Sequence, residues 1–162
     1  MKNFDYLNIH THIHTKDPVG ITVDSLGSVY VGDSGNYRIR LIQNGTVSTF
    51  CGTGIEAIVD GPLGVGELDS IAQIYFDPIS ESILVSQVTT NFLRIVNASG
   101  YITTVAGTGQ SLPIKNGVAK TSTFNSPVAF IRDEISQDYF VAEENGNRVR
   151  RMTSKDIVFF FS

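Results

Sequence analysis

Short runs of alternating hydrophobic and polar residues extend along most of the chain. In its first part these runs cover residues 21–23, 29–31, 38–42 and 47–50. Successive side chains of a β-strand point to opposite faces, so this period of two predicts half-buried strands. Turn residues separate the runs, as in the hairpin dipeptide Asn44-Gly45. No segment has both helical period and helical length, so the sequence predicts an all-β fold.

The pattern occurs three times. The stretch VYVGDSGNYRIRLI at 29–42 returns as YFVAEENGNRVRRM at 139–152 and, in degenerate form, as ILVSQVTTNFLRIV at 83–96. Similarly, GTVSTFCGTG at 45–54 returns as GYITTVAGTG at 100–109. The connecting segments also match, since DGPLGVGELDSI lines up with NGVAKTSTFNSP. Four runs in each unit predict four antiparallel strands, which form one blade of a β-propeller.

The first unit resembles a known family. Residues 18–42, PVGITVDSLGSVYVGDSGNYRIRLI, resemble the NHL repeat, in which a Pro-x-Gly opening precedes Val-Asp, a glycine turn and an Asp-x-Gly-Asn-x-Arg-Ile-Arg strand pair. The copy at 127–152 matches well, and the copy at 71–96 matches only in part. The resemblance covers residues 18–162 and implies an NHL-type propeller of about three four-stranded blades.

Closed propellers typically have about 4 to 8 blades, so three blades predict an incomplete or open arc. We expect a piece of a longer propeller in the first place and a homodimer that completes a ring in the second, and an arc that caps its own ends is the third alternative. The expected divisions are an N-terminal segment at 1–17 with an extra or closing strand, blade 1 at 18–54, a connector at 55–70, blade 2 at 71–109, a connector at 110–126, and blade 3 at 127–162, truncated at its end.

Composition narrows the classes of partner. Twelve Lys and Arg against 16 Asp and Glu give a net charge of -4, which disfavours a sequence-independent grip on nucleic acid. The single cysteine, Cys51, lies in an apolar run and is expected to be a small core residue. No signal peptide or membrane span is recognised, so we expect a cytoplasmic protein. Two N-glycosylation triplets, at Asn44 and Asn97, favour export instead.

An acid at the end of the second run and an arginine at the start of the third change together between units. The pairs are Asp33 with Arg38 in the first unit and Glu143 with Arg148 in the third, whereas the second unit has Gln87 and Phe92. This pattern predicts a structural ion pair across each of the two hairpins. Ligand binding by Arg38 and Arg148 is the alternative.

Three histidines near the start of the chain form a candidate metal site. His10, His12 and His14 alternate, so a strand would place all three on one face, and His-x-His pairs can bind zinc. The segment also resembles the opening of amidohydrolases of the TatD type. Such an enzyme needs further histidines on a barrel, and this sequence has no other histidine. An edge or closing strand is therefore the favoured interpretation.

Three aspartates form a second candidate metal site. Asp24, Asp77 and Asp133 each follow the innermost strand of a unit and could ring the central opening, where lactonase-like propellers hold calcium. Turn residues follow each of them, so capping of the local turn is the favoured role. The basic run Arg148, Arg150, Arg151 and Lys155 is expected to form a solvated blade face rather than a phosphate site.

These observations favour a non-catalytic module that mediates protein–protein interaction. The connectors at 55–70 and 110–126 are the expected contact surface, because they are long, contain glycine and differ between units. No catalytic residue and no cofactor is implied. The alternative is a fragment of a six-bladed propeller enzyme of the lactonase or amidating-lyase kind, with its metal on the axis. RNA binding, which also occurs among NHL proteins, is less favoured.

Overall fold

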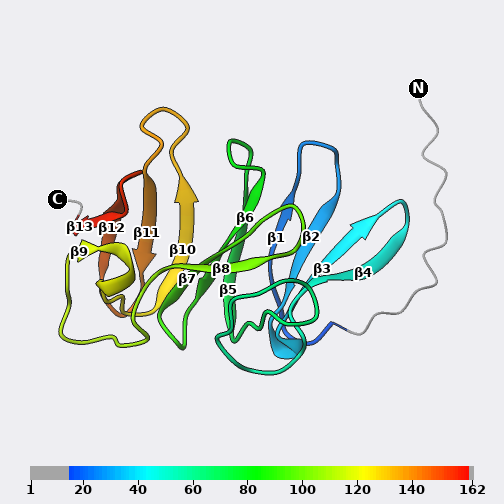
Figure 1. Ribbon diagram of the computed structural model, residues 1–162, viewed down its shortest axis with the longest axis horizontal. Helices are drawn as coiled ribbons and strands as arrows, with labels where there is room; N and C mark the ends of the chain where they lie inside the picture. Colours follow the sequence, from blue (N-terminus) through cyan, green and yellow to red (C-terminus); the bar gives the residue numbers. More distant parts are fainter. Residues whose placement is uncertain (1–14, 161–162) are drawn as a thin grey trace.

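The computed structural model describes residues 15–160, which form three antiparallel sheets (Figure 1). The first sheet contains β1 (Pro18–Val23), β2 (Val29–Asp33), β3 (Arg38–Gln43) and β4 (Thr46–Cys51). The second contains β5 (Ile71–Asp77), β6 (Ser82–Gln87), β7 (Phe92–Val96) and β8 (Ile102–Ala106). The third contains β10 (Pro127–Arg132), β11 (Tyr139–Glu143), β12 (Arg148–Met152), β13 (Ile157–Phe160) and β9 (Gly117–Val118). The all-β prediction is confirmed.

The three sheets are copies of one unit. Each is a meander in which consecutive strands pair, and the pairing of the first two strands shifts register at the same place in every sheet. These shifts lie between Pro18 and Ile21, between Ile71 and Gln73, and between Pro127 and Ala129. A one-residue shift in register moves the following side chains to the other face of the sheet. Because this shift occurs in all three copies, it is a regular feature of the repeated unit.

The sheets stand side by side as an open arc, and each is called a blade from here on. Strand β5 packs against both β1 and β10, so the first strands of the three blades line a common hub. Figure 1 shows blade 1 in blue and cyan, blade 2 in green, and blade 3 in yellow to red. The predicted open propeller arc is therefore confirmed. In the described part of the chain, no helix has the length and apolar character needed to cross a membrane.

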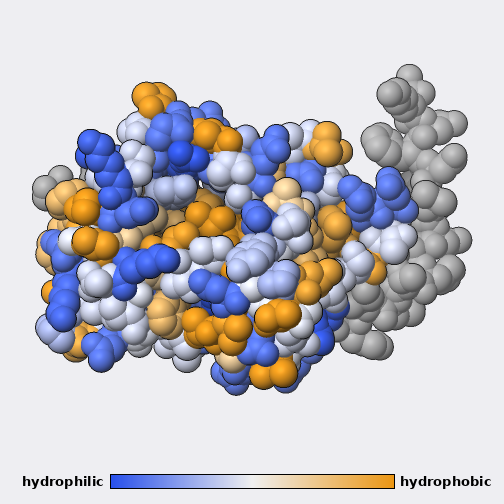
Figure 2. All heavy atoms as spheres, viewed as in Figure 1, coloured by the Kyte–Doolittle hydropathy of each residue, from blue (hydrophilic) through white to orange (hydrophobic). Residues whose placement is uncertain are grey.

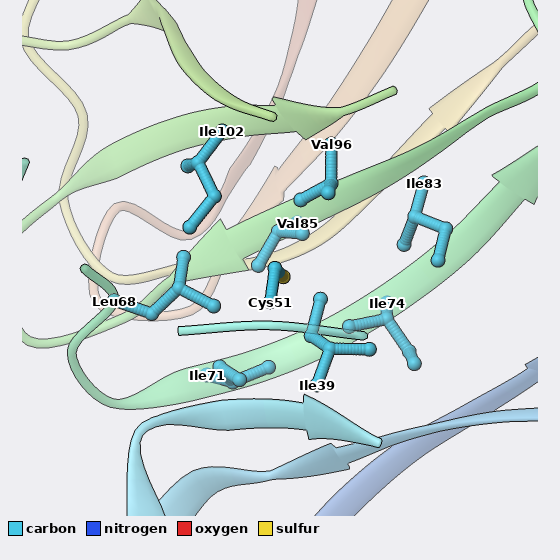
Figure 3. Close-up of a cluster of buried hydrophobic side chains, with 9 residues drawn as sticks. All are labelled: Ile39, Cys51, Leu68, Ile71, Ile74, Ile83, Val85, Val96 and Ile102. Atoms are coloured by element: carbon cyan, nitrogen blue, oxygen red, sulfur yellow. The ribbon is translucent and has the colours of Figure 1, made fainter. Parts of the chain in front are cut away.

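Two hydrophobic clusters hold the arc together, one at each junction between blades. The cluster between blades 1 and 2 is drawn in Figure 3 and consists of Ile39, Cys51, Leu68, Ile71, Ile74, Ile83, Val85, Val96 and Ile102. The cluster between blades 2 and 3 consists of Leu84, Leu93, Ala106, Ala119, Phe124, Phe130, Val141, Met152 and Val158. Blade 2 is covered on both faces, and all six residues of β6 are buried.

The connectors are more ordered than the sequence indicates, because each wraps around the outer edge of the following blade. In the connector 110–126, strand β9 pairs with β13 and gives blade 3 a fifth strand. In the connector 55–70, Gly61 forms a bridge with Ile102 on β8. The short 3-10 helices are Ser34–Asn36 and Ala119–Thr121. The connectors thus belong to the blades rather than hanging free between them.

Candidate functional site

A buried arginine occupies the same position on the third strand of every blade. Arg40, Arg94 and Arg150 are 9%, 0% and 0% exposed. Arg40 lies 2.7 Å from Asp33 in blade 1, and Arg150 lies 3.0 Å from Glu143 in blade 3. Charges buried to this extent are stable only when they are paired and hydrogen-bonded.

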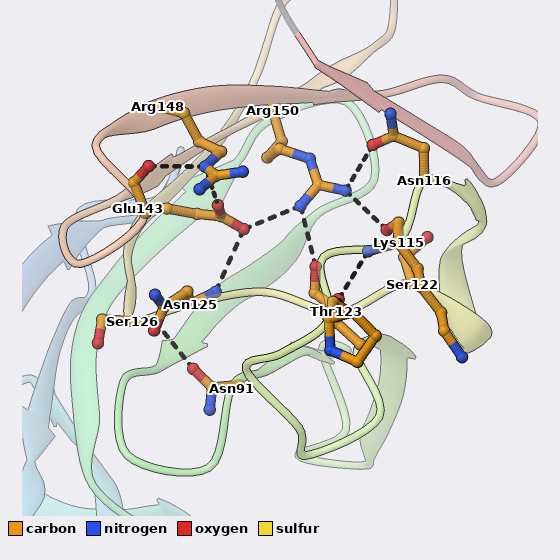
Figure 4. A network of polar contacts seen from close by, with 12 residues as sticks. Asn91, Lys115, Asn116, Ser122, Thr123, Asn125, Ser126, Glu143, Arg148 and Arg150 are labelled. Atoms are coloured by element: carbon orange, nitrogen blue, oxygen red, sulfur yellow. Dashed lines mark hydrogen bonds and ion pairs between the residues drawn. The ribbon is translucent and has the colours of Figure 1, made fainter.

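In blades 2 and 3 this arginine also fastens the preceding connector. Arg150 donates to the backbone oxygens of Thr123 and Lys115, each at 2.9 Å, and to Asn116 Oδ1 at 2.8 Å (Figure 4). Arg94 makes the equivalent bonds to Val59, Glu67 and Asp60, at 3.0, 3.3 and 2.8 Å. The arginine therefore ties each connector to the blade that follows it.

The predicted ion pair of blade 1 needs correction. Asp33 pairs with Arg40, and Arg38 instead donates to the backbone oxygen of Thr53 at 2.6 Å. In blade 3, Arg148 does lie 3.2 Å from Glu143, but it shares this acid with Arg150. The arginine at the position of Arg40 is present in all three sequence units, and this repetition is the signal that could have identified it.

The basic run is not one solvated face. Arg150 is fully buried, whereas Arg151 is exposed over 44% of its side chain and pairs with Asp138. Arg148 lies between these extremes at 30%. The solvated-face interpretation is therefore wrong for Arg150, because its guanidinium is buried and is bound to Glu143 and to the connector 110–126.

The three aspartates each cap a hairpin turn. Asp24 accepts hydrogen bonds from the backbone N–H groups of Leu26 and Ser28 at 2.9 and 2.8 Å. Asp77 accepts one from the backbone of Ile79, and Asp133 accepts one from the backbone of Ser136. Burial alone would raise the pKa values of Asp24 and Asp77. The hydrogen bonds that these carboxylates accept lower the pKa values by more, so both lie below the ordinary value.

No cluster of three or more His, Cys, Asp or Glu side chains suited to a metal ion occurs within residues 15–160. His10, His12 and His14 lie outside these described residues. Cys51 is fully buried, and burial raises the pKa of its thiol to about 12. The expectation that Cys51 is a core residue is confirmed.

In blade 2 the acid at the end of the second strand is absent, and an acid from the preceding connector lies beside that position instead. The sequence did not reveal this substitution. Gln87 stands where the other blades have an acid, and its Nε2 donates to Asp69 Oδ1 at 2.8 Å. Asp69 is 1% exposed. Burial, assisted by the nearby Glu56 carboxylate, raises the pKa of Asp69 to about 6 although Arg94 and Gln87 oppose the shift.

A cleft of about 390 Å³ opens between blades 1 and 2, and we call it the interblade cleft. Its walls are the apolar and aromatic side chains of Tyr30, Leu41, Phe50, Phe76, Ile83 and Val96. Its rim carries the polar side chains of Asp24, Ser25, Gln43, Glu81 and Asn97. The hydroxyl of Tyr30 donates to Asp24 Oδ2 at 3.2 Å. Burial and the charge of Asp24 raise the pKa of Tyr30.

The two end blades each present an apolar face to solvent. On blade 1, Val19, Ile21 and Val23 are 37%, 68% and 53% exposed. On blade 3, the opposite face exposes Ile131, Val149 and Phe159, each over 41% to 46% of its surface. We call these the first flank and the last flank.

Comparison with known proteins agrees with the geometry. The blades around a common hub define an open β-propeller arc, and the solved structures it resembles are propeller proteins. A profile of the NHL repeat matches residues 15–40, which carry β1, β2 and the start of β3. No curated protein sequence matches the chain significantly.

Three solved structures illustrate the similarity. An auxiliary nutrient binding protein from Bacteroides thetaiotaomicron VPI-5482 is 18% identical with a TM-score of 0.69, over 88% of this chain and 37% of that one. A streptogramin B lyase is 13% identical with a TM-score of 0.64, and the match covers 95% of this chain and 43% of that one. Virginiamycin B lyase from Staphylococcus aureus is 18% identical with a TM-score of 0.59, and the match covers 90% of this chain and 41% of that one. The chain thus spans well under half of each structure, and the likeness concerns the fold.

Proposed function

We propose that this chain is a non-catalytic propeller module that mediates protein–protein interaction, and that its flanks bind a second copy of the chain. The observation that carries the proposal is the exposure of apolar positions whose equivalents inside the arc are buried. Ile21 is 68% exposed, whereas its equivalents Ile74 and Phe130 are 2% and 1% exposed. Each of the latter two is covered by the preceding blade.

The last flank supplies the complementary surface. Val149 occupies the position of Ile39 and Leu93, which are fully buried against the following blade, yet it is 41% exposed. A first flank and a last flank therefore correspond to the two sides of an internal blade junction. Two copies joined head to tail at both ends would bring six blades into one ring, within the range of closed propellers.

The connectors provide a further surface for a protein partner. Ile55, Leu63, Val65 and Leu112 are 54% to 67% exposed, and Figure 2 shows hydrophobic patches along the lower edge, where Figure 1 places the connector 55–70. Arg94 and Arg150 hold the connectors against the outer strands, so these apolar side chains stand at fixed positions. A partner with apolar side chains at matching positions would bind without ordering the loops first.

Mass in solution tests the flank proposal. By analytical ultracentrifugation we expect a species of twice the chain mass of 17.7 kDa at micromolar concentration. Ile21→Asp would place an uncompensated charge in each junction, so this variant should sediment as a monomer. The matched control is Leu26→Asp, because Leu26 is 90% exposed on a hairpin tip outside the flanks. This control should keep the wild-type mass.

Two outcomes would contradict the proposal. One is a wild-type protein that remains monomeric at all concentrations or forms only polydisperse aggregate. The other is a Leu26→Asp variant that dissociates as fully as Ile21→Asp, since that would show a general effect of surface charge.

A further inference from the structure

The interblade cleft has a counterpart at the junction between blades 2 and 3, and the two differ at one decisive position. Phe76 and Arg132 are equivalent, because each is the residue directly before the turn aspartate of its blade. Both side chains face the preceding blade. The junction between blades 2 and 3 therefore shows which groups surround an arginine at this position of the repeated unit.

At the junction of blades 2 and 3 the arginine fills the space. Arg132 Nη1 lies 3.0 Å from Asp77 Oδ2, and its guanidinium carbon lies 5.2 Å from the centre of the Tyr139 ring. Its Nε donates to the backbone oxygen of Gln137 at 3.3 Å. Under this cover Asp77 is only 1% exposed. A guanidinium thus receives a carboxylate, an aromatic face and a carbonyl oxygen in one place.

The interblade cleft keeps the acid of this arrangement but lacks the cation. Asp24 is the equivalent of Asp77, and Glu81 replaces Gln137, so two carboxylates stand at the rim. None of the described residues that line the cleft is a lysine or an arginine. The hydrogen bonds that Asp24 accepts lower its pKa, so it is ionised at neutral pH.

The interior of the cleft suits an apolar group. Tyr30 and Phe50 meet edge to face with their ring centres 4.9 Å apart, and Phe76 lies on the opposite wall. A volume of about 390 Å³ falls in the range of small-molecule pockets, which combine apolar walls with a few polar groups.

We propose that the interblade cleft binds an organic cation, namely a guanidinium or primary ammonium group on a short aromatic or aliphatic body. The cation lies between Asp24 and Glu81, and the apolar body lies against Tyr30, Phe50 and Phe76. A free small molecule and an arginine side chain of a peptide offer the same chemistry. The site lies within one chain, so it does not depend on the association of two copies.

Titration of the full chain with matched probes tests this assignment. By isothermal titration calorimetry or protein NMR, benzylguanidine and benzylamine should bind at least about tenfold more tightly than benzyl alcohol, which has the same body without the charge. The capped peptide acetyl-Gly-Arg-Gly-amide forms the second arm. Binding of the small cations alone identifies a free small molecule, and binding of the peptide alone identifies an arginine of a partner. The proposal is overturned if none of the three cationic probes binds.

Variants of the cleft separate the cation site from simple hydrophobic binding. Asp24→Asn keeps an oxygen that accepts the turn bonds from Leu26 and Ser28, so it should fold and lose at least about tenfold in affinity for the cations. The matched control is Asp133→Asn, which alters the equivalent turn of blade 3 and should leave affinity unchanged.

A third variant blocks the site. Phe76→Arg should reproduce the pair formed by Arg132 and Asp77, and should thereby abolish binding of the probes. Unchanged cation binding in Asp24→Asn, or equal affinity for benzyl alcohol, overturns the proposal even if Phe76→Arg fails to fold.

Discussion

Arg150→Ala should lower the free energy of unfolding by about 3 to 5 kcal/mol, since removal of one partner leaves a buried charge without compensation. Glu143 is 3% exposed and would keep the backbone N–H of Asn125 and a single cation, Arg148, which is itself partly exposed. The backbone oxygen of Thr123 would also lose the bond from Arg150, and that of Lys115 would keep only the 3.4 Å bond from the backbone N–H of Thr123. Urea unfolding followed by circular dichroism measures the loss.

The matched control is Arg151→Ala on the same strand. Arg151 is 44% exposed and makes one ion pair with the buried Asp138, which keeps the hydrogen bond from the backbone N–H of Ser154 when Arg151 is removed. The control should therefore lose clearly less free energy of unfolding than Arg150→Ala, because Arg150 also holds two backbone oxygens and Asn116 of the connector. Equal losses in the two variants would show that Arg150 does not anchor the connector in solution.

Asp69→Asn should stabilise the protein at pH 7 by about 1 to 3 kcal/mol. Burial raises the pKa of Asp69 to about 6 in the folded state, against 3.8 as the ordinary value. Between these values the unfolded state has lost the proton that the folded state retains, so stability falls as pH rises from about 4 to about 6. Asparagine removes this penalty, and its oxygen still accepts the bond from Gln87.

The pH dependence provides the internal control for this variant. Thermal melts of both proteins between pH 4 and pH 7 should show an advantage of Asp69→Asn that grows with pH and approaches zero near pH 4. A variant that is less stable than the wild type at pH 7 would show that the negative charge of Asp69 is needed in the blade 1–2 junction.

The repeat made most of the fold predictable from the sequence. Strand period, turn residues and blade number all follow from comparing the chain with itself, because every blade must bury equivalent faces. Side-chain partners were less predictable. Asp33 and Arg38 are direct neighbours across the β2–β3 hairpin, yet Asp33 binds Arg40, and Arg38 donates to the backbone oxygen of Thr53 instead.

Other features depend on three-dimensional packing that a strand pattern does not encode. The burial of Asp69 could not be predicted from the sequence, because it arises from the connector folding over blade 2. The interblade cleft has Phe76 where the next junction has an arginine, a difference that has meaning only when both junctions are compared. The connectors were expected to be contact loops, and their attachment through Arg94 and Arg150 could not be read from loop length and glycine content.

Mixing two flank variants tests most directly the claim that the flanks are two halves of one blade junction. Ile21→Asp damages the first flank, and Ile131→Asp damages the last flank. Each variant alone can form only junctions with one damaged side. An equimolar mixture can form one junction in which both sides are wild type.

Sedimentation of the separate and mixed variants at the same total concentration therefore gives a clear result. The account predicts that each variant alone sediments near 17.7 kDa and that the mixture contains a heterodimer of twice this mass. A mixture that sediments like the separate variants, while the wild type forms dimers, would contradict the head-to-tail arrangement of blades.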